Sequence, residues 1–161
     1  MKKIFFTVAF ATMIGFGAIG LTSCSGDDEL KEVVQGTYGL YKVQVTLSGD
    51  WKDFIVITSF AGSQKDGGNL TYLNTGEKTA LAYAISDDKK EQVMSCQTSE
   101  DGIGIAGGVN VGTGRPECVG KSMGIEVKVF KNGKVLKSEK KTIVGTLNVT
   151  NTQIFLTSEE N

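Results

Sequence analysis

The sequence predicts an all-β protein, a single antiparallel β-sandwich of about eight or nine strands. Three observations support this prediction. Apolar residues alternate with polar ones along several short segments, the pattern of strands with one buried face. Glycine, asparagine and aspartate gather between those segments, where turns are needed. No segment shows a convincing amphipathic helical period.

The first strands have the clearest patterns. Residues 41–47 alternate β-branched or aromatic residues with polar ones, which predicts a half-buried strand. A Ser-Gly-Asp break at 48–50 ends that strand. Residues 51–60 then predict a second one, which we expect to be central because Phe54 to Ile57 are all apolar. A turn-rich loop follows at 64–69.

Later segments complete the sandwich. The weaker candidates are, in chain order, Leu70 to Leu73, Leu81 to Ile85, Gln92 to Thr98 and Ile103 to Val111. A clearer hairpin follows, since Met123 to Val129 alternate, Asn132-Gly133 is the sequence of a type I′ turn, and Val135 to Lys137 return. The last candidates are Ile143 to Val149 and Ile154 to Leu156.

The N-terminus predicts export. Met1-Lys2-Lys3 is positive, and Ile4 to Gly20 run without a charge. This order is typical of a secretory signal peptide. An uncleaved membrane helix is the alternative, since about 20 apolar residues can span a bilayer. The glycines and the missing basic flank favour cleavage.

Leu21-Thr22-Ser23-Cys24 follows directly and resembles the lipobox of bacterial lipoproteins. The resemblance implies that the thiol of Cys24 receives a diacylglycerol and that the chain is cut before it. The membrane is therefore an expected partner, because two or three acyl chains anchor a protein durably.

The residues behind Cys24 are acidic. Ser25, Asp27, Asp28 and Glu29 resemble the export signal of Bacteroidetes-type surface lipoproteins. The resemblance implies transfer to the outer leaflet of the outer membrane and exposure at the cell surface. The alternative is a solvated tether on the periplasmic face, because adjacent like charges repel.

These boundaries divide the chain of 161 residues into a signal peptide at 1–23, an acidic flexible tether at 24–35 and one β-sandwich domain at 36–158. The domain is long enough to bury about two-thirds of its unfolded surface. The formal net charge of the whole chain is −1. So weak a charge argues against nucleic acid as a partner.

The strand order resembles the small immunoglobulin-like sandwich lipoproteins of Bacteroidetes, on the residues Tyr41 to Asp50, Ser95 to Thr98 and Val127 to Val135. Gly36-Thr37-Tyr38, which opens a first strand, is similar to calycin-like barrel lipoproteins, so a β-barrel is the alternative. Trp51 precedes both later cysteines, whereas true immunoglobulin domains place a tryptophan between them.

Catalytic chemistry is poorly supported. The chain has no histidine, which excludes Ser-His-Asp and Cys-His nucleophile pairs and any imidazole metal site. With Cys24 assigned to lipid, Cys96 and Cys118 remain, and a disulfide between them stays open against two free thiols. We expect no enzyme activity, no cofactor and no metal.

Other motifs have plain structural interpretations. Gly120-Lys121-Ser122 lacks the glycine spacing of a phosphate-binding loop. The pairs Asp87-Asp88 and Glu100-Asp101 lack the spaced ligands of a calcium loop, so we expect solvated turns. The lysines between Lys121 and Lys141 are expected on an edge strand, where they discourage sheet-to-sheet aggregation. The alternative is that they bind acidic glycans or lipopolysaccharide.

Aromatic residues beside turns are the candidates for ligand contact, namely Trp51 and Tyr72. The sequence therefore predicts a lipid-anchored binding or accessory module of the cell surface, with a glycan or a protein as its ligand. A structural or scaffold component of the envelope is the alternative. An enzyme without a recognisable motif is the third possibility.

Overall fold

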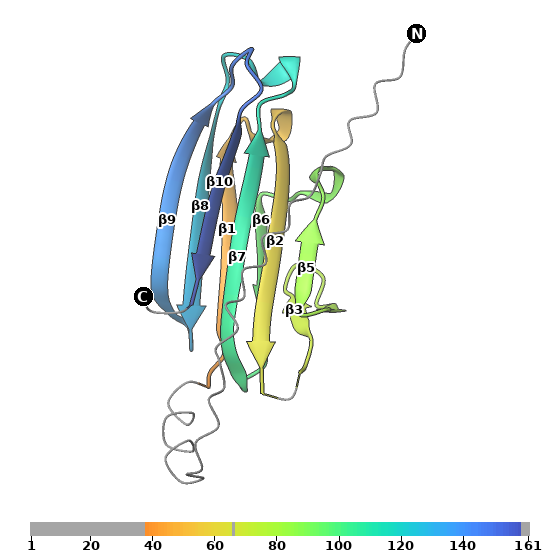
Figure 1. Cartoon of the computed structure of the whole chain (residues 1–161), viewed down its shortest axis with the longest axis vertical. Coiled ribbons are helices and arrows are strands. Elements are labelled where there is room, and N and C mark those ends of the chain that lie inside the picture. The colour runs from red at the N-terminus through yellow and green to blue at the C-terminus, as the bar shows by residue number, and fades with distance from the viewer. Residues whose placement is uncertain (1–37, 66, 159–161) are drawn as a thin grey trace, which may run out of the picture.

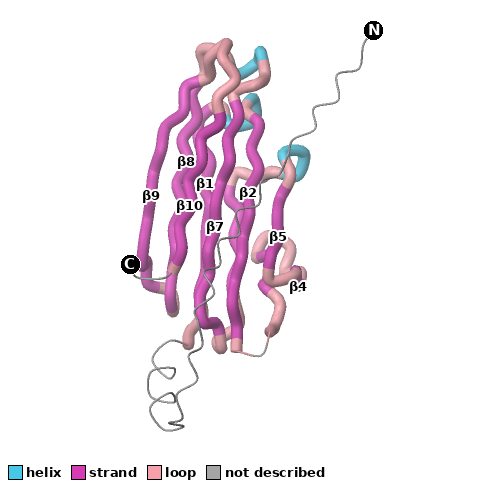
Figure 2. The backbone as a smooth tube through the Cα atoms, viewed as in Figure 1, coloured by secondary structure: helices cyan, strands magenta, loops and turns pink. Residues whose placement is uncertain are grey.

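The structure is a computed structural model that describes residues 38–65 and 67–158. It confirms the sandwich: two antiparallel sheets lie face to face, and short turns and loops join the strands at both ends (Figures 1 and 2). No helix in the described part of the chain is long and apolar enough to cross a membrane. The lipidation residue Cys24 and the export residues Ser25, Asp27, Asp28 and Glu29 lie outside the described residues.

The larger sheet has the spatial order β4 (Lys78–Thr79), β3 (Leu70–Tyr72), β6 (Val93–Gln97), β1 (Tyr41–Gly49), β8 (Ser122–Lys131) and β9 (Lys134–Val144). The smaller sheet has the order β10 (Asn151–Thr157), β7 (Gly102–Gly112), β2 (Ile55–Gln64) and β5 (Ala82–Ile85). Three single-turn 3₁₀ helices are η1 (Trp51–Asp53), η2 (Asp87–Lys89) and η3 (Pro116–Cys118). The described strands form two separate sheets, so the barrel alternative is wrong.

Most predicted strands are present, and β2 is central as expected, between β7 and β5. Two predictions need correction. Trp51 to Asp53 form η1 instead of the start of a strand, because the N–H of Phe54 bonds the Trp51 carbonyl. The separate strand predicted for 143–149 does not form: Ile143 and Val144 are the last residues of β9, and Leu147 is 87% exposed in the loop that follows.

The core lies between the inner faces of the two sheets. On β1 every second residue from Tyr41 to Leu47 is buried, and on β8 every second residue from Met123 to Val129. Strand β7 crosses over β1 at a glycine: a Cβ atom on Gly107 would lie 2.4 Å from Cγ1 of Val43. The two sheets thus approach closely at a position where one of them carries no side chain.

The hairpin between β8 and β9 has the predicted turn. Asn132 and Gly133 have φ angles of 50° and 78°. Both angles are positive, as a type I′ turn requires. This turn sets the pairing of Lys131 with Lys134 and of Phe130 with Val135; the register then shifts once, between Val129 and Phe130, before the pairing continues to Ser122 and Val144.

The structure contains no disulfide between the two cysteines, a pairing that the sequence left open. Cys96 and Cys118 are both free and buried. Cys96 pairs with Val43 near the start of β1, whereas Cys118 lies at the other end of the sandwich, in η3. About six residues of strand, or about 20 Å, separate these levels. A disulfide needs Cα atoms within about 7 Å. Burial raises the pKa of Cys96 to about 12.

An ionised carboxylate ties three segments together at one end of the sandwich. Oδ1 of Asp87 accepts hydrogen bonds from the N–H of Val56 (2.8 Å) and from Nζ of Lys90 (2.6 Å), and Oδ2 pairs with Arg115. Burial opposes the ionisation of Asp87. The hydrogen bonds from Lys90 and Val56 and the charges of Lys90 and Arg115 outweigh it, so the pKa of Asp87 is lowered. The Asp87-Asp88 pair is therefore not simply a solvated turn.

We expect Gly107→Ala to destabilise the protein by about 1–3 kcal/mol, because the new methyl group would overlap Val43 in a packed core. Urea unfolding measures this change. Gly114→Ala is the matched control: the nearest atom to its added Cβ would be 3.8 Å away, so the free energy of unfolding should stay within about 0.5 kcal/mol. Equal effects of the two substitutions would contradict the close approach of β7 and β1.

We expect Asp87→Asn to lower the free energy of unfolding by about 1–3 kcal/mol at pH 7. The pKa of Asp87 is lower in the folded protein than in the unfolded one. The stabilisation by its ionised carboxylate is therefore complete above the unfolded pKa of about 3.9 and is lost as the pH falls through the folded pKa. The difference between wild type and variant should therefore shrink below about pH 4. Asp101→Asn, at an exposed position, is the control. A difference that does not change with pH would contradict this role.

Candidate functional site

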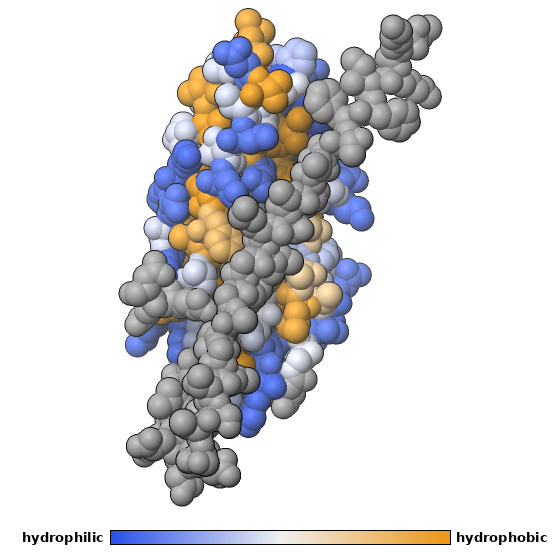
Figure 3. Space-filling view, in the orientation of Figure 1, coloured by the Kyte–Doolittle hydropathy of each residue, from blue (hydrophilic) through white to orange (hydrophobic). Residues whose placement is uncertain are grey.

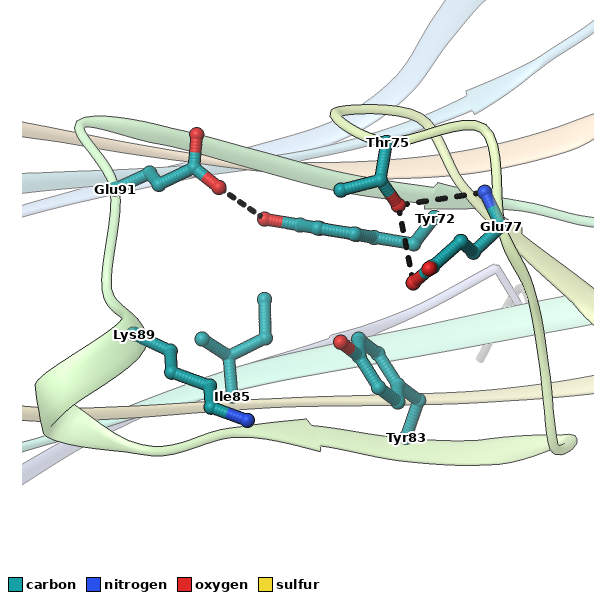
Figure 4. Close-up of a pocket in the computed structure, with 7 residues that line it drawn as sticks. All are labelled: Tyr72, Thr75, Glu77, Tyr83, Ile85, Lys89 and Glu91. Carbon is teal, nitrogen blue, oxygen red and sulfur yellow. Dashed lines mark hydrogen bonds between the residues drawn. The ribbon is translucent and has the colours of Figure 1, made fainter.

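Two tyrosines from opposite sheets meet at one side of the sandwich. Tyr72 comes from β3 and Tyr83 from the edge strand β5. Their ring centroids are 5.5 Å apart and the rings are tilted by 48° (Figure 4). Tyr72 is almost fully buried and Tyr83 is half-buried. The pair therefore presents aromatic surface at the opening between two sheet margins.

A cavity of about 220 Å³ lies around these rings, and we call it the tyrosine pocket. It is lined by Tyr72, Thr75, Glu77, Tyr83, Ile85, Lys89 and Glu91. The turn after β3 supplies Thr75 and Glu77, and the chain around η2 supplies Lys89 and Glu91. The pocket thus combines side chains from β3 and the turn after it, in the larger sheet, with side chains from β5 of the smaller sheet and from the chain around η2.

Glu91 is held in place at the phenolic end of Tyr72. The hydroxyl of Tyr72 donates to Oε1 of Glu91 at 3.0 Å, and Nδ2 of Asn74 donates to Oε2 at 3.0 Å. Asn74 is itself fixed, because its Nδ2 also donates to the carbonyl of Val93 at 2.6 Å. Burial and the hydrogen bond to Glu91 raise the pKa of Tyr72. Tyr72 therefore remains a protonated donor at neutral pH.

Glu77 lies at the other end of the Tyr72 ring (Figure 4). Its Oε2 accepts from Oγ1 of Thr75 at 3.4 Å, and its N–H donates to the same Oγ1 at 3.3 Å. In the described part of the chain neither Glu77 nor Glu91 forms an ion pair. Two carboxylates that accept hydrogen bonds therefore flank an aromatic ring.

The two aromatic residues singled out in the sequence do not share a site. Tyr72 lies in the tyrosine pocket, but Trp51 is half-buried in η1, with Nζ of Lys52 at 5.6 Å from its ring centroid. Sequence reasoning did not single out Tyr83 and gave no sign of the two glutamates. No spacing pattern links β3 with β5, because the two strands belong to different sheets.

The remaining sequence candidates have structural roles or none. The Gly-Lys-Ser motif runs directly into strand β8, so no helix follows it to bind phosphate. The edge strand β9 carries Lys134, Lys137, Lys140 and Lys141, as an edge that resists aggregation does. Nζ of Lys140 and of Lys128 bond Glu126 across the sheet surface, at 3.1 and 2.9 Å.

Exposed apolar residues occur in the loop between β9 and β10 and on β10 itself. In the view of Figure 3 apolar and hydrophilic residues are interspersed over the visible face. The most exposed apolar side chains are Leu147 (87%), Val149 (76%) and Phe155 (56%). Phe155 belongs to β10, an edge strand of the smaller sheet.

Solved structures with a similar fold come from two Bacteroides species. The chain is 22% identical to a domain of unknown function (DUF4425) from Bacteroides vulgatus, with a TM-score of 0.68 over 78% of this chain and 98% of that one. A DUF4425 family protein from Bacteroides ovatus gives 22% identity and a TM-score of 0.69, over 78% and 99%. These two likenesses concern the fold alone.

A third similar structure is the calcium-bound form of a protein from Parabacteroides distasonis. It is 25% identical to this chain, with a TM-score of 0.58 over 84% of this chain and 99% of that one. No curated protein matches the sequence.

A family model described as "PLAT/LH2 and C2-like Ca2+-binding lipoprotein" matches residues 5–156, almost the whole chain. This description agrees with the lipoprotein predicted from Leu21 to Cys24, and the similar structures agree with the Bacteroidetes resemblance. It does not confirm an immunoglobulin-like domain. The chain belongs to the family of PLAT/LH2 and C2-like Ca²⁺-binding lipoproteins.

Proposed function

We propose that this lipoprotein is a binding module without enzyme activity, anchored by lipid on Cys24 at the outer face of the outer membrane. Its ligand is a carbohydrate, bound in the tyrosine pocket. The observation that carries the proposal is the pair of rings of Tyr72 and Tyr83, flanked by Glu77 and Glu91.

The chemistry of the pocket suits a neutral sugar. Sugar hydroxyl groups donate hydrogen bonds, and ionised carboxylates accept them through both oxygens. The apolar faces of a sugar ring pack on aromatic side chains, which bring large contact area. The ring of Tyr83 supplies that surface, and Lys89 adds a donor on the same rim. A cavity of about 220 Å³ is small, so we expect one sugar unit to enter it.

A protein partner is the second candidate, and one observation favours it. Strand β10 forms an edge of the smaller sheet and carries no charged residue between Asn151 and Thr157. Phe155 on this strand is 56% exposed. An uncharged edge strand is able to pair with a strand of another chain. In this case the protein would serve as a scaffold of the envelope.

Calcium is named both in the family description and for the similar structure from Parabacteroides distasonis. Calcium takes six to eight oxygen ligands, several of them carboxylates. Within residues 38–65 and 67–158 no three acidic or other metal-ligating side chains gather in one place. The acidic side chains of the described residues therefore do not form a calcium cage by themselves, and the proposed function does not depend on calcium.

We expect Tyr83→Ala to weaken binding to a neutral oligosaccharide by about tenfold, because the stacking surface is lost. A glycan array with the purified protein identifies the sugar, and calorimetry measures its affinity. Glu77→Gln, at an exposed position, should weaken the same binding without affecting the unfolding temperature.

Phe155→Lys is the matched control, on an edge strand that does not line the pocket. It should leave sugar binding unchanged. If Tyr83→Ala binds every sugar as the wild type does, the tyrosine pocket is not the ligand site. Loss of a protein partner through Phe155→Lys would favour the scaffold function instead.

We expect the triple substitution Asp27→Asn, Asp28→Asn, Glu29→Gln to leave the protein lipidated but to keep it on the periplasmic face. The acidic residues behind Cys24 carry the export resemblance. Proteinase digestion of intact cells measures exposure, and Cys24→Ala is the control that removes the anchor itself. Digestion of the triple variant at the wild-type rate would contradict an acidic export signal.

A further inference from the structure

Lys90 places its ammonium group inside a cage of oxygen atoms. Nζ of Lys90 lies 2.6 Å from the carbonyl oxygen of Phe54, 2.6 Å from Oδ1 of Asp87 and 3.2 Å from the carbonyl oxygen of Lys52. Its side chain is only 9% exposed. We call these three oxygens the Lys90 cage. The two carbonyls come from the chain at η1, and the carboxylate comes from η2.

The three oxygens of the Lys90 cage are two backbone carbonyl oxygens and one carboxylate oxygen. Backbone carbonyls from a loop together with a carboxylate are the ligand types that Ca²⁺ takes in proteins. Here those oxygens already surround a positive charge, and all three accept hydrogen bonds from it. The lysine joins η1 to η2, two connections that the sheet hydrogen bonds do not join.

Two further ion pairs lie at this end of the sandwich. Oδ2 of Asp53 bonds Nζ of Lys121 at 2.8 Å, and Arg115 pairs with Asp87. A cavity of about 330 Å³ beside them is lined by Lys52, Asp53, Arg115 and Glu117, two basic and two acidic residues. A divalent ion entering here would meet several positive charges at short range, which repel it.

We infer that Lys90 is a built-in cation: its ammonium group is held by two carbonyl oxygens and one carboxylate oxygen, ligand types that calcium also takes, and it keeps this end of the sandwich ordered without a metal ion. The inference concerns a site apart from the tyrosine pocket and holds whether or not that pocket binds a sugar. It sets this chain apart from a family named for calcium binding. Removing the lysine side chain leaves the three oxygens free for a divalent ion.

Substitution of Lys90 tests this role. In EDTA, Lys90→Ala should have a lower unfolding temperature than the wild type. About 10 mM CaCl₂ should raise the unfolding temperature of the variant by about 2–4 °C, because calcium that binds the folded state weakly, as at extracellular sites, stabilises it by that amount. The wild type should show a smaller calcium response. Lys141→Ala, which removes an exposed lysine of β9, is the matched control and should respond as the wild type does.

Terbium reports on the same place. Tb³⁺ is a luminescent substitute for Ca²⁺ that a nearby tryptophan sensitises, and Trp51, the lone tryptophan of the chain, directly precedes the cage residue Lys52. Lys90→Ala should gain terbium luminescence excited through tryptophan. The double variant Asp87→Asn, Lys90→Ala should lose it, because the carboxylate of the cage is gone.

Three results would overturn the inference. The first is a Lys90→Ala variant that folds but gains neither calcium stabilisation nor terbium luminescence. The second is the same calcium response in Lys141→Ala as in Lys90→Ala. The third is terbium luminescence in the wild type that Asp87→Asn abolishes, since the lysine would then not keep the metal out. This last measurement decides the matter even if Lys90→Ala folds neither with nor without calcium.

Discussion

The packing of β1 against β7 is the constraint on which the rest of the structure depends. Both strands are central or near-central in their sheets, and β1 turns an unbroken row of apolar side chains toward the other sheet. Gly107 lets the backbone of β7 approach Val43 closely. Since buried apolar area is the main favourable contribution to folding, this contact sets the distance between the sheets. The positions of the margins and of the connecting turns follow from it.

The candidate site follows from that distance. The margins of the two sheets come together at β3 and β5, and the rings of Tyr72 and Tyr83 fill the space between them. The outer part of this contact is polar, because the turn after β3 and the chain after η2 bring Glu77 and Glu91 to its rim. A binding site at such a margin leaves the apolar core intact.

One end of the sandwich is held by charge. The loops there bury little apolar surface of their own, since η1 and η2 contain no fully buried residue. Asp87 and Lys90 replace that missing packing with a hydrogen-bonded ion pair, which joins η2 to the start of β2. Partly buried pairs of this kind gain strength from their low-dielectric surroundings, provided that each polar atom is bonded. In the role that we propose for it, the lysine neutralises inward-pointing oxygens, as a calcium ion does in proteins that bind one.

The sequence by itself determined the sandwich class, most strands and the hairpin turn at Asn132-Gly133, because a period of two residues and a positive φ are local properties of the chain. It also identified a lipoprotein, since Leu21 to Cys24 form a contiguous motif. Only the tertiary structure decided which strands share a sheet, and therefore that Tyr72 meets Tyr83, that Cys96 and Cys118 stay apart, and that Lys90 reaches the oxygens of η1. These are contacts between segments distant along the chain, and no spacing along the sequence records them, because they arise from burying two faces at once.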